Sequence, residues 1–438
     1  MTHNLCMPNI RVKPWLAPVG LLCATFALAQ SFSEPASERL RQIRARLATA
    51  RREGNWPAYL AGAREQSRFL DGSPLSRLEM ARAQMRLGDV HAALDDVAAY
   101  VGMGQASSFI DSSPEFASLR DTAGFAPVRR QLLDNRLPVS GASVAFHLAD
   151  SGLLPEDIDY DAKRQRFMIT SVLEHKVVSV DAAGKSTDFA AAPDGWPMMA
   201  LKIDARRELL WATEVAMNGF TAVPKTEQGR SVLLCYDLKN GHLLRRIEGP
   251  RPTALADIAL TAEGDVIASD GDHGGVYRLK FAGNQWERLD AGDFISPQTP
   301  AMAADGKHLY VPDYTRGIGV LDVQSKRVHW IPAAGRFALG GIDGMYRISG
   351  TLFAVQNGTD PERVIQFKLD ASGSHVLSET VIERSTATLG DPTHAVVIAG
   401  SLYYIANSGW DVLTEAGEVE AGKKLTGALI MRARIKQR

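Results

Sequence analysis

The stretch Leu154-Pro-Glu-Asp-Ile-Asp-Tyr160 is followed by the strand-like segment Arg166-Phe-Met-Ile-Thr-Ser171, and this two-part phrase recurs five times toward the C-terminus. The later copies of its second part are Leu209–Ala212, Asp265–Ala268, His308–Val311, Thr351–Ala354 and Ser401–Tyr404. Counted from Phe167, the second residues of the six copies are separated by 43, 56, 43, 43 and 50 positions. Short β-type segments that return at such a period predict a β-propeller with one blade per period.

About four strands fit into each period. In the third period they are expected at Ala256–Leu260, Asp265–Ser269, Gly275–Leu279 and Gln285–Leu289. The sixth period ends after three strands, whereas Ala142–His147 precedes the first blade and belongs to no period. We therefore predict that this strand completes the last blade, which removes an open sheet edge. The predicted fold class is mainly β, with a six-bladed propeller over residues 142–434.

Residues 35–134 have a helical pattern instead. Helices are expected at Ala36–Arg52, Tyr59–Phe69, Ser76–Arg86 and Val90–Tyr100. The segment Ala81–Leu94 resembles a tetratricopeptide helix pair, so we expect a small all-α, helical-repeat-like domain before the propeller. Two roles stay open for it: a groove that binds a partner protein, or helices that pack on the propeller or cap it. The arginines of the first helix fall around its circumference, which favours a solvated surface.

The N-terminal residues have the features of a secretory signal peptide. Arg11 and Lys13 precede an apolar run from Trp15 to Leu28, and Ala27-Leu-Ala29 supplies small residues for cleavage. We therefore expect a signal peptide over residues 1–29 and an exported protein, periplasmic or extracellular. An uncleaved anchor is the alternative. No stable membrane span is expected after cleavage, because no other segment is apolar and long enough.

Charge and cysteine content narrow the range of partners. The formal net charge is -1, which gives no reason to expect nucleic acid as a partner. Cys235 is the one cysteine beyond the expected signal peptide, and it lies in the apolar strand Val232–Tyr236. We interpret it as a small buried hydrophobic residue.

The channel of a propeller is lined by the first strand of every blade. Aligning the six phrases places one ring of residues around the axis: Glu156, Met199, Ala256, Gln298, Asp343 and Thr393. A second ring follows: Asp157, Ala200, Asp257, Thr299, Gly344 and His394. Carboxylates that converge on a channel repel one another unless a cation or a proton lies between them.

This pattern predicts a metal site in the channel. The expected ligands are Glu156, Gln298 and Asp343, an all-oxygen set of the kind that calcium prefers. No paired histidines or cysteines are available for a zinc or copper site. The candidate catalytic residues are His394, as a general base, and the neighbouring polar residue Asp257.

Three segments resemble the family of regucalcin, gluconolactonase and luciferin-regenerating enzyme: Pro155–Asp161, Asp305–Asp313 and Gly341–Met345. The resemblance covers residues 142 to 434 and implies a six-bladed propeller with a divalent cation, usually calcium, in its channel. It also implies hydrolysis of lactones or related esters. The family's metal-binding glutamate and aspartate fall on Glu156 and Asp343. Its two asparagines fall on Gln298 and Ala256, so the sequence departs from the pattern there.

Two functions are compatible with these observations, since a propeller fold alone does not choose between them. The first is a metal-dependent hydrolase that acts on a small-molecule lactone or ester in the channel. The second is a non-catalytic propeller that binds a ligand or, through its helical domain, a protein.

Overall fold

The computed structural model describes residues 34–435 of the 438-residue chain. The signal peptide predicted over residues 1–29 lies outside the described residues. Within the described part, no helix is both long and apolar enough to cross a membrane.

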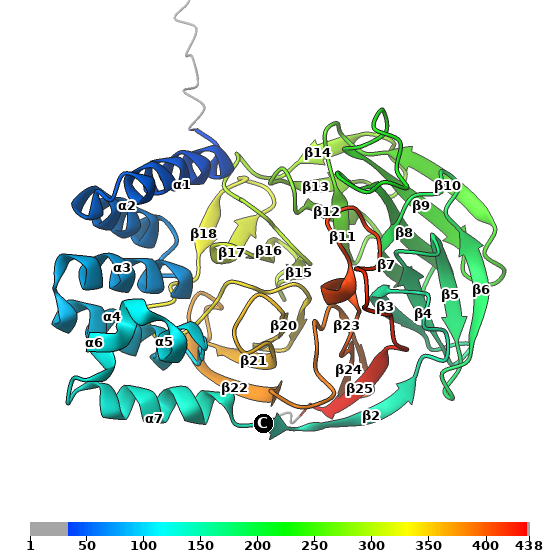
Figure 1. The fold of residues 1–438 in the computed structure, drawn as a ribbon. Coiled ribbons are helices and arrows are strands. Elements are labelled where there is room, and N and C mark those ends of the chain that lie inside the picture. The colour runs from blue at the N-terminus through cyan, green and yellow to red at the C-terminus, as the bar shows by residue number, and fades with distance from the viewer. Residues whose placement is uncertain (1–33, 436–438) are drawn as a thin grey trace, which may run out of the picture. The chain divides into compact units, whose positions relative to one another are not determined.

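Six antiparallel sheets stand around a common channel and form a six-bladed β-propeller, which confirms the predicted fold class (Figure 1). The strands of the first three blades are β3 (Pro155–Asp161), β4 (Arg166–Ser171), β5 (Lys176–Val180), β6 (Ser186–Ala191), β7 (Met198–Asp204), β8 (Leu209–Ala216), β9 (Arg230–Asp237), β10 (Leu243–Glu248), β11 (Leu255–Leu260), β12 (Val266–Asp270), β13 (Val276–Leu279) and β14 (Trp286–Arg288). The strands of the fourth and fifth blades are β15 (Ala301–Met302), β16 (His308–Asp313), β17 (Gly317–Asp322), β18 (Val328–Trp330), β19 (Met345–Ile348), β20 (Thr351–Gln356), β21 (Arg363–Leu369) and β22 (Val376–Arg384).

The sixth blade joins the two ends of the propeller. Its sheet has the order β2-β25-β24-β23, from β23 (Ala395–Ile398), β24 (Ser401–Ile405), β25 (Leu429–Arg434) and β2 (Ala142–His147). Strand β2 pairs antiparallel with β25, from Ala142 opposite Ala433 to His147 opposite Leu429. The predicted closure by residues 142–147 is therefore confirmed.

The fifth blade has one strand more than the repeat predicts. The two-residue strand β1 (Val139–Ser140) pairs with the outer edge of β22, with Val139 opposite Arg384. The repeat pattern does not predict this strand, because two residues are too few to show a strand pattern. The added pairing ties the end of the helical region to the fifth blade.

Apolar side chains from neighbouring sheets fill the space between blades. Between the first two blades, for example, Met168 and Val177 pack with Leu201, Ala212 and Leu234, all of them buried. These residues lie on strands whose near-continuous burial reflects a sheet that is covered on both faces. The core is thus a ring of interfaces, and it holds each innermost strand in a fixed position at the channel.

Between residue 34 and the propeller the structure has seven α-helices: α1 (Ala36–Arg52), α2 (Trp56–Phe69), α3 (Pro74–Leu87), α4 (Val90–Gly102), α5 (Phe109–Ser112), α6 (Ala117–Arg120) and α7 (Phe125–Arg136). The Asp89 side chain accepts a hydrogen bond from the backbone N–H of Ala92 and caps α4. Gly88 ends α3 in the left-handed conformation with φ of 80°, where a residue with a side chain would be strained.

Polar contacts connect the helical region to the third, fourth and fifth blades. The N–H of Ala36 donates to the carbonyl of Gly292 at 2.8 Å, and the N–H of Ala333 donates to the Asp71 carboxylate at 2.7 Å. Arg363 of β21 is fully buried, and its Nη1 lies 3.5 Å from the carbonyl oxygen of Met103. The helices therefore pack on the propeller, as one of the two predicted roles requires.

Candidate functional site

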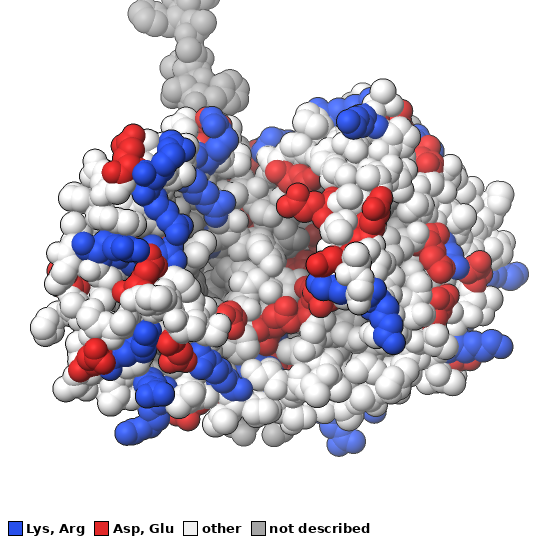
Figure 2. All heavy atoms as spheres, viewed as in Figure 1, with Lys and Arg blue, Asp and Glu red and all other residues white. Residues whose placement is uncertain are grey.

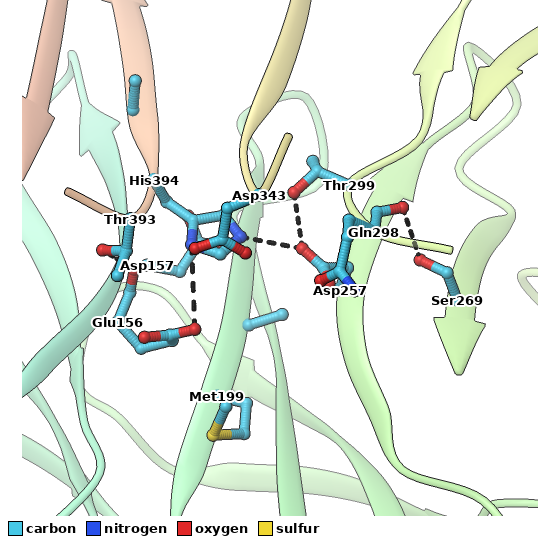
Figure 3. A network of polar contacts seen from close by, with 12 residues as sticks. Glu156, Asp157, Met199, Asp257, Ser269, Gln298, Thr299, Asp343, Thr393 and His394 are labelled. Atoms are coloured by element: carbon cyan, nitrogen blue, oxygen red, sulfur yellow. Dashed lines mark hydrogen bonds and ion pairs between the residues drawn. The ribbon is translucent and has the colours of Figure 1, made fainter. Parts of the chain in front are cut away.

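Four polar side chains from the predicted rings converge in the channel (Figure 3). Glu156 lies on β3 and Asp257 on β11, while Asp343 and His394 lie just before β19 and β23. Glu156, Asp257 and His394 are buried, and Asp343 exposes only 9% of its surface. Because these residues lie on or just before the innermost strands of four blades, the ring of blades itself determines their spacing.

Glu156, Asp343 and His394 form a group that could hold a metal ion. One carboxylate oxygen of each acid and one imidazole nitrogen all lie within 4.8 Å of one another. The Nδ1 atom of His394 is 4.0 Å from Oε1 of Glu156. Two carboxylates and one imidazole at this spacing are a plausible donor set for a divalent cation.

The other nitrogen of His394 is held by Asp257. Its Nε2 atom lies 2.7 Å from Oδ1 of Asp257, and the Thr299 hydroxyl donates to the same oxygen at 2.5 Å. Nδ1 of His394 is buried and has no hydrogen-bond partner among residues 34–435. Burial opposes the charged imidazolium, but the charge of Asp157 and the hydrogen bond with Asp257 raise the pKa of His394 well above its usual value.

Glu156 and Asp343 have neutral hydrogen-bond donors as partners. The indole N–H of Trp410 donates to Glu156 at 2.6 Å, and the side-chain amide of Asn357 donates to Asp343 at 2.9 Å. Burial, followed by the charge of Asp343, raises the pKa of Glu156 to about 8. Burial, together with the charge of Asp257, raises the pKa of Asp343 to about 7, although His394 opposes this shift. The raised pKa values show that nearby positive charge does not fully compensate the negative charge of Glu156 and Asp343.

Asp157 is a channel carboxylate whose hydrogen-bond and ion-pair partners are both supplied by this protein. Its Oδ2 atom accepts a hydrogen bond from the backbone N–H of Leu201 at 2.9 Å and an ion pair from Lys202 at 2.8 Å. Its charge is thus balanced within the chain, and a cation is not needed beside it.

Gln298, the third metal ligand predicted from the sequence, makes other contacts. Its amide nitrogen lies 3.1 Å from the Ser296 hydroxyl and 3.3 Å from the Ser296 carbonyl. Its backbone carbonyl accepts a hydrogen bond from Ser269 (Figure 3). A role for Gln298 as an oxygen donor stays a prediction.

Trp410 and Asn357 also belong to the site, although the repeat register does not identify them as site residues. Trp410 is the first residue of the short 3-10 helix Trp410–Val412 and lies 254 positions from Glu156 in the sequence. Asn357 directly follows β20, the second strand of the blade that carries Asp343. The available signal was weak: a polar residue after a second strand is also a typical turn residue.

Acidic side chains surround the hollow on the face shown in Figure 2. The carboxylate of Glu362 accepts a hydrogen bond from the N–H of Asp391 at 2.7 Å. Burial, followed by the nearby charge of Asp411, raises the pKa of Asp391 to about 6. The charge of Asp391 also raises the pKa of Asp343, so this acidic region adds to the negative potential at the channel.

No protein-family model and no curated protein sequence matches the chain. Similar solved structures include a calcium-binding protein, regucalcin, from Agrobacterium tumefaciens (16% identity, 67% of this chain and 96% of that chain covered, TM-score 0.46). They also include a gluconolactonase from Xanthomonas campestris (16%, 66% and 88%, TM-score 0.44). A third is the PQQ-bound aldose sugar dehydrogenase from Streptomyces coelicolor (12%, 67% and 99%, TM-score 0.46). Since these proteins differ in activity, the likeness concerns the fold.

Proposed function

We propose that this protein binds a divalent cation in the propeller channel and hydrolyses a lactone or small ester there. The observation that carries the proposal is the buried pair Glu156 and Asp343, which faces the unpartnered Nδ1 of His394 and has only neutral donors as its other partners. The exported location predicted from the N-terminal residues is part of the proposal.

The charge balance of the channel favours a bound cation. Lys202 balances Asp157, and Asp257 accepts a hydrogen bond from Nε2 of His394. Among residues 34–435, no lysine or arginine forms an ion pair with Glu156 or Asp343, and two buried carboxylates without such a partner are costly in a site of low dielectric constant. A divalent cation would neutralise both, and it would bind Nδ1 of His394 in place of the proton that the raised pKa keeps on the ring.

The donor set widens the choice of metal beyond the calcium expected from the sequence. Calcium prefers oxygen ligands, whereas manganese, iron and zinc also accept imidazole. With His394 in the group, calcium is one candidate among several divalent cations. When bound, such an ion supplies a Lewis acid that polarises a carbonyl oxygen and acidifies a bound water.

The side chains around the group hold it in place. Asp257 accepts from Nε2 of His394, which fixes the imidazole ring with Nδ1 directed into the channel. Trp410 and Asn357 each fix one carboxylate by a single hydrogen bond and leave other oxygen lone pairs available. Burial of the group keeps bulk water from the proposed reaction centre.

The test is calorimetric titration of the chelator-treated protein with Ca²⁺, Mn²⁺ and Zn²⁺ in separate experiments. We expect saturable binding of one ion, weakened at least about a hundredfold by Glu156→Gln or Asp343→Asn, because each removes a charged ligand. Asp272→Asn, a matched carboxylate-to-amide change outside the group, should leave the affinity unchanged. A screen of lactones and small esters follows with the ion that binds.

Two results would separate the proposed function from the alternative. Absence of binding for all three ions would overturn the metal site. Binding without turnover of any lactone or ester would refute the hydrolase and favour the non-catalytic propeller.

A further inference from the structure

The helical region contains a groove of about 570 Å³ that the proposed hydrolase does not use. It lies between α1 and α3, above Tyr59 of α2. Five residues define its walls: Arg44, Arg51, Arg52, Leu75 and Glu79. Lys and Arg side chains gather over this helical part of the face in Figure 2, whereas acidic side chains gather around the hollow of the propeller.

The groove carries more positive than negative charge, because three arginines and one glutamate line it. Arg44 and Arg51 form no side-chain hydrogen bond or ion pair with any residue from 34 to 435, and Arg52 contacts only the Thr49 hydroxyl, at 3.3 Å. Other arginines of α1 are paired elsewhere: Arg41 with Glu38, and Arg46 with Glu65.

The one acidic residue of the groove, Glu79, interacts with the charges of Arg44 and Arg51 and has a hydrogen-bond partner. The Glu79 carboxylate accepts a hydrogen bond from the Gln66 amide at 2.6 Å. Three arginines therefore stand against a single carboxylate, and the groove favours an anionic ligand.

An apolar surface lies beside these charges. Leu75, at the start of α3, is 53% exposed, which is high for a leucine next to a concave surface. Leu47 and Tyr59 are almost fully buried and form the floor. A ligand that fits this groove therefore presents acidic groups and at least one apolar group together.

The spacing of the arginines indicates an extended chain. Arg44 and Arg51 are seven residues apart, so they lie on one face of α1, about 10 Å apart along its axis. In a polyproline II segment, side chains three residues apart lie on the same side at a separation of about 9 Å. Two acidic residues at this spacing can each meet one arginine.

We propose that the α1–α3 groove binds an extended acidic segment of a partner protein, with acidic residues three positions apart and an apolar side chain between them. The acidic side chains contact Arg44 and Arg51, and the apolar one packs on Leu75. Nucleic acid is disfavoured because its continuous row of phosphates needs a longer basic surface than this groove and a chain of net charge -1 provide. A membrane surface is disfavoured because the charges line a concave groove.

The test measures fluorescence anisotropy of a fluorescein-labelled, proline-rich peptide with two glutamates three positions apart and one leucine between them, titrated with the full chain. We expect saturable binding that weakens when NaCl is raised from about 0.05 to about 0.5 M. Arg44→Glu combined with Arg51→Glu should weaken it about tenfold or more. Arg64→Glu combined with Arg68→Glu, the same charge change on α2 outside the groove, is the matched control.

Three outcomes would overturn the proposal. The first is no binding of the peptide, and the second is an equal loss in the groove variant and in the control. The third is equal binding of a peptide with glutamines in place of glutamates. Capture of the protein by phosphatidylglycerol vesicles, without peptide binding, would assign the groove to a membrane surface. Cation binding in the channel is measured separately, so failure here leaves the channel proposal standing.

Discussion

Two sets of buried polar side chains lie close together in the propeller and are satisfied in opposite ways. The first set, which we call the strand-end set, lies at or near the ends of the second strands of five blades: Ser171, Glu214, Asp270, Asp313 and Gln356. These side chains bond to the backbone of nearby loops. Asp313, for example, accepts N–H groups from Ile295, Ser296, Thr315 and Arg316.

The second set consists of Glu156, Asp257, Asp343 and His394 in the channel. Its side-chain oxygen and nitrogen atoms contact other side chains. Backbone groups stay in place whether or not a ligand is present, so the strand-end set stabilises the fold. The carboxylates of the channel set have negative charge that backbone groups do not balance, so they can bind a cation. Partner type, more than burial, therefore separates structural carboxylates from functional ones in this protein.

Asp313→Ala should have the largest effect on stability. The substitution leaves four backbone N–H groups without their acceptor, at a cost of roughly 1 kcal/mol or more each. We expect the free energy of unfolding to fall by about 3 to 5 kcal/mol, measured by urea denaturation followed through tryptophan fluorescence.

Asp343→Asn is the contrasting variant in the same assay. In chelator-treated protein at pH 8 it should be no less stable than the parent, because it removes one of two carboxylates that repel each other. A larger loss for Asp343→Asn than for Asp313→Ala would break the comparison between the two sets.

Asp257→Asn should have an effect of intermediate size, and the quantity that changes is the affinity for a divalent cation. An amide removes the charge that faces His394 and can favour the tautomer with hydrogen on Nδ1, which cannot bind a cation through that atom. We expect cation affinity to fall about 10- to 100-fold in calorimetry. The pKa of His394 should also fall, measured by NMR titration of the imidazole in metal-free protein.

Thr299→Val provides the control for this variant. It removes the other donor to Asp257 but leaves the carboxylate and its contact with His394. Cation affinity should change less than in Asp257→Asn. Unchanged affinity in Asp257→Asn would show that Asp257 does not position a metal ligand.

The fold could be predicted from the sequence to within a few residues. Strands expected at Asp265–Ser269 and Gly275–Leu279 occur at Val266–Asp270 and Val276–Leu279. Periodic burial makes such strands visible, because every blade repeats the same apolar pattern. Strand β1 was missed, because its pairing with β22 depends on tertiary position and not on a local pattern.

The site was predictable only as far as the repeat register reaches. The register placed Glu156, Asp343, Asp257 and His394 around one axis, and the structure brings these four side chains together. It could not show which nitrogen of His394 faces the carboxylates, nor that Trp410 contacts Glu156. Those features depend on rotamers and on a loop that belongs to no repeat.

Glu214→Gln should have the smallest effect, and it tests the strand-end set through pH. One oxygen of Glu214 accepts the N–H groups of Asp194 and Trp196, while the other has no partner among the described residues. Burial raises the pKa of this carboxyl from 4.5 to about 7, since the two backbone bonds only partly offset it.

The sign of the expected pH dependence follows from proton binding. Between pH 4.5 and about 7 the folded protein holds the Glu214 proton more tightly than the unfolded chain does, so stability is greatest at low pH and is lost as the pH rises through 7. Glutamine keeps the backbone acceptor and removes the charge. We expect Glu214→Gln to gain about 1 kcal/mol over the parent between pH 5 and 8 in urea denaturation. Glu263→Gln, at an exposed site, should show the same dependence of stability on pH as the parent. If Glu214→Gln also shows the parent's dependence, the backbone bonds alone satisfy this carboxylate.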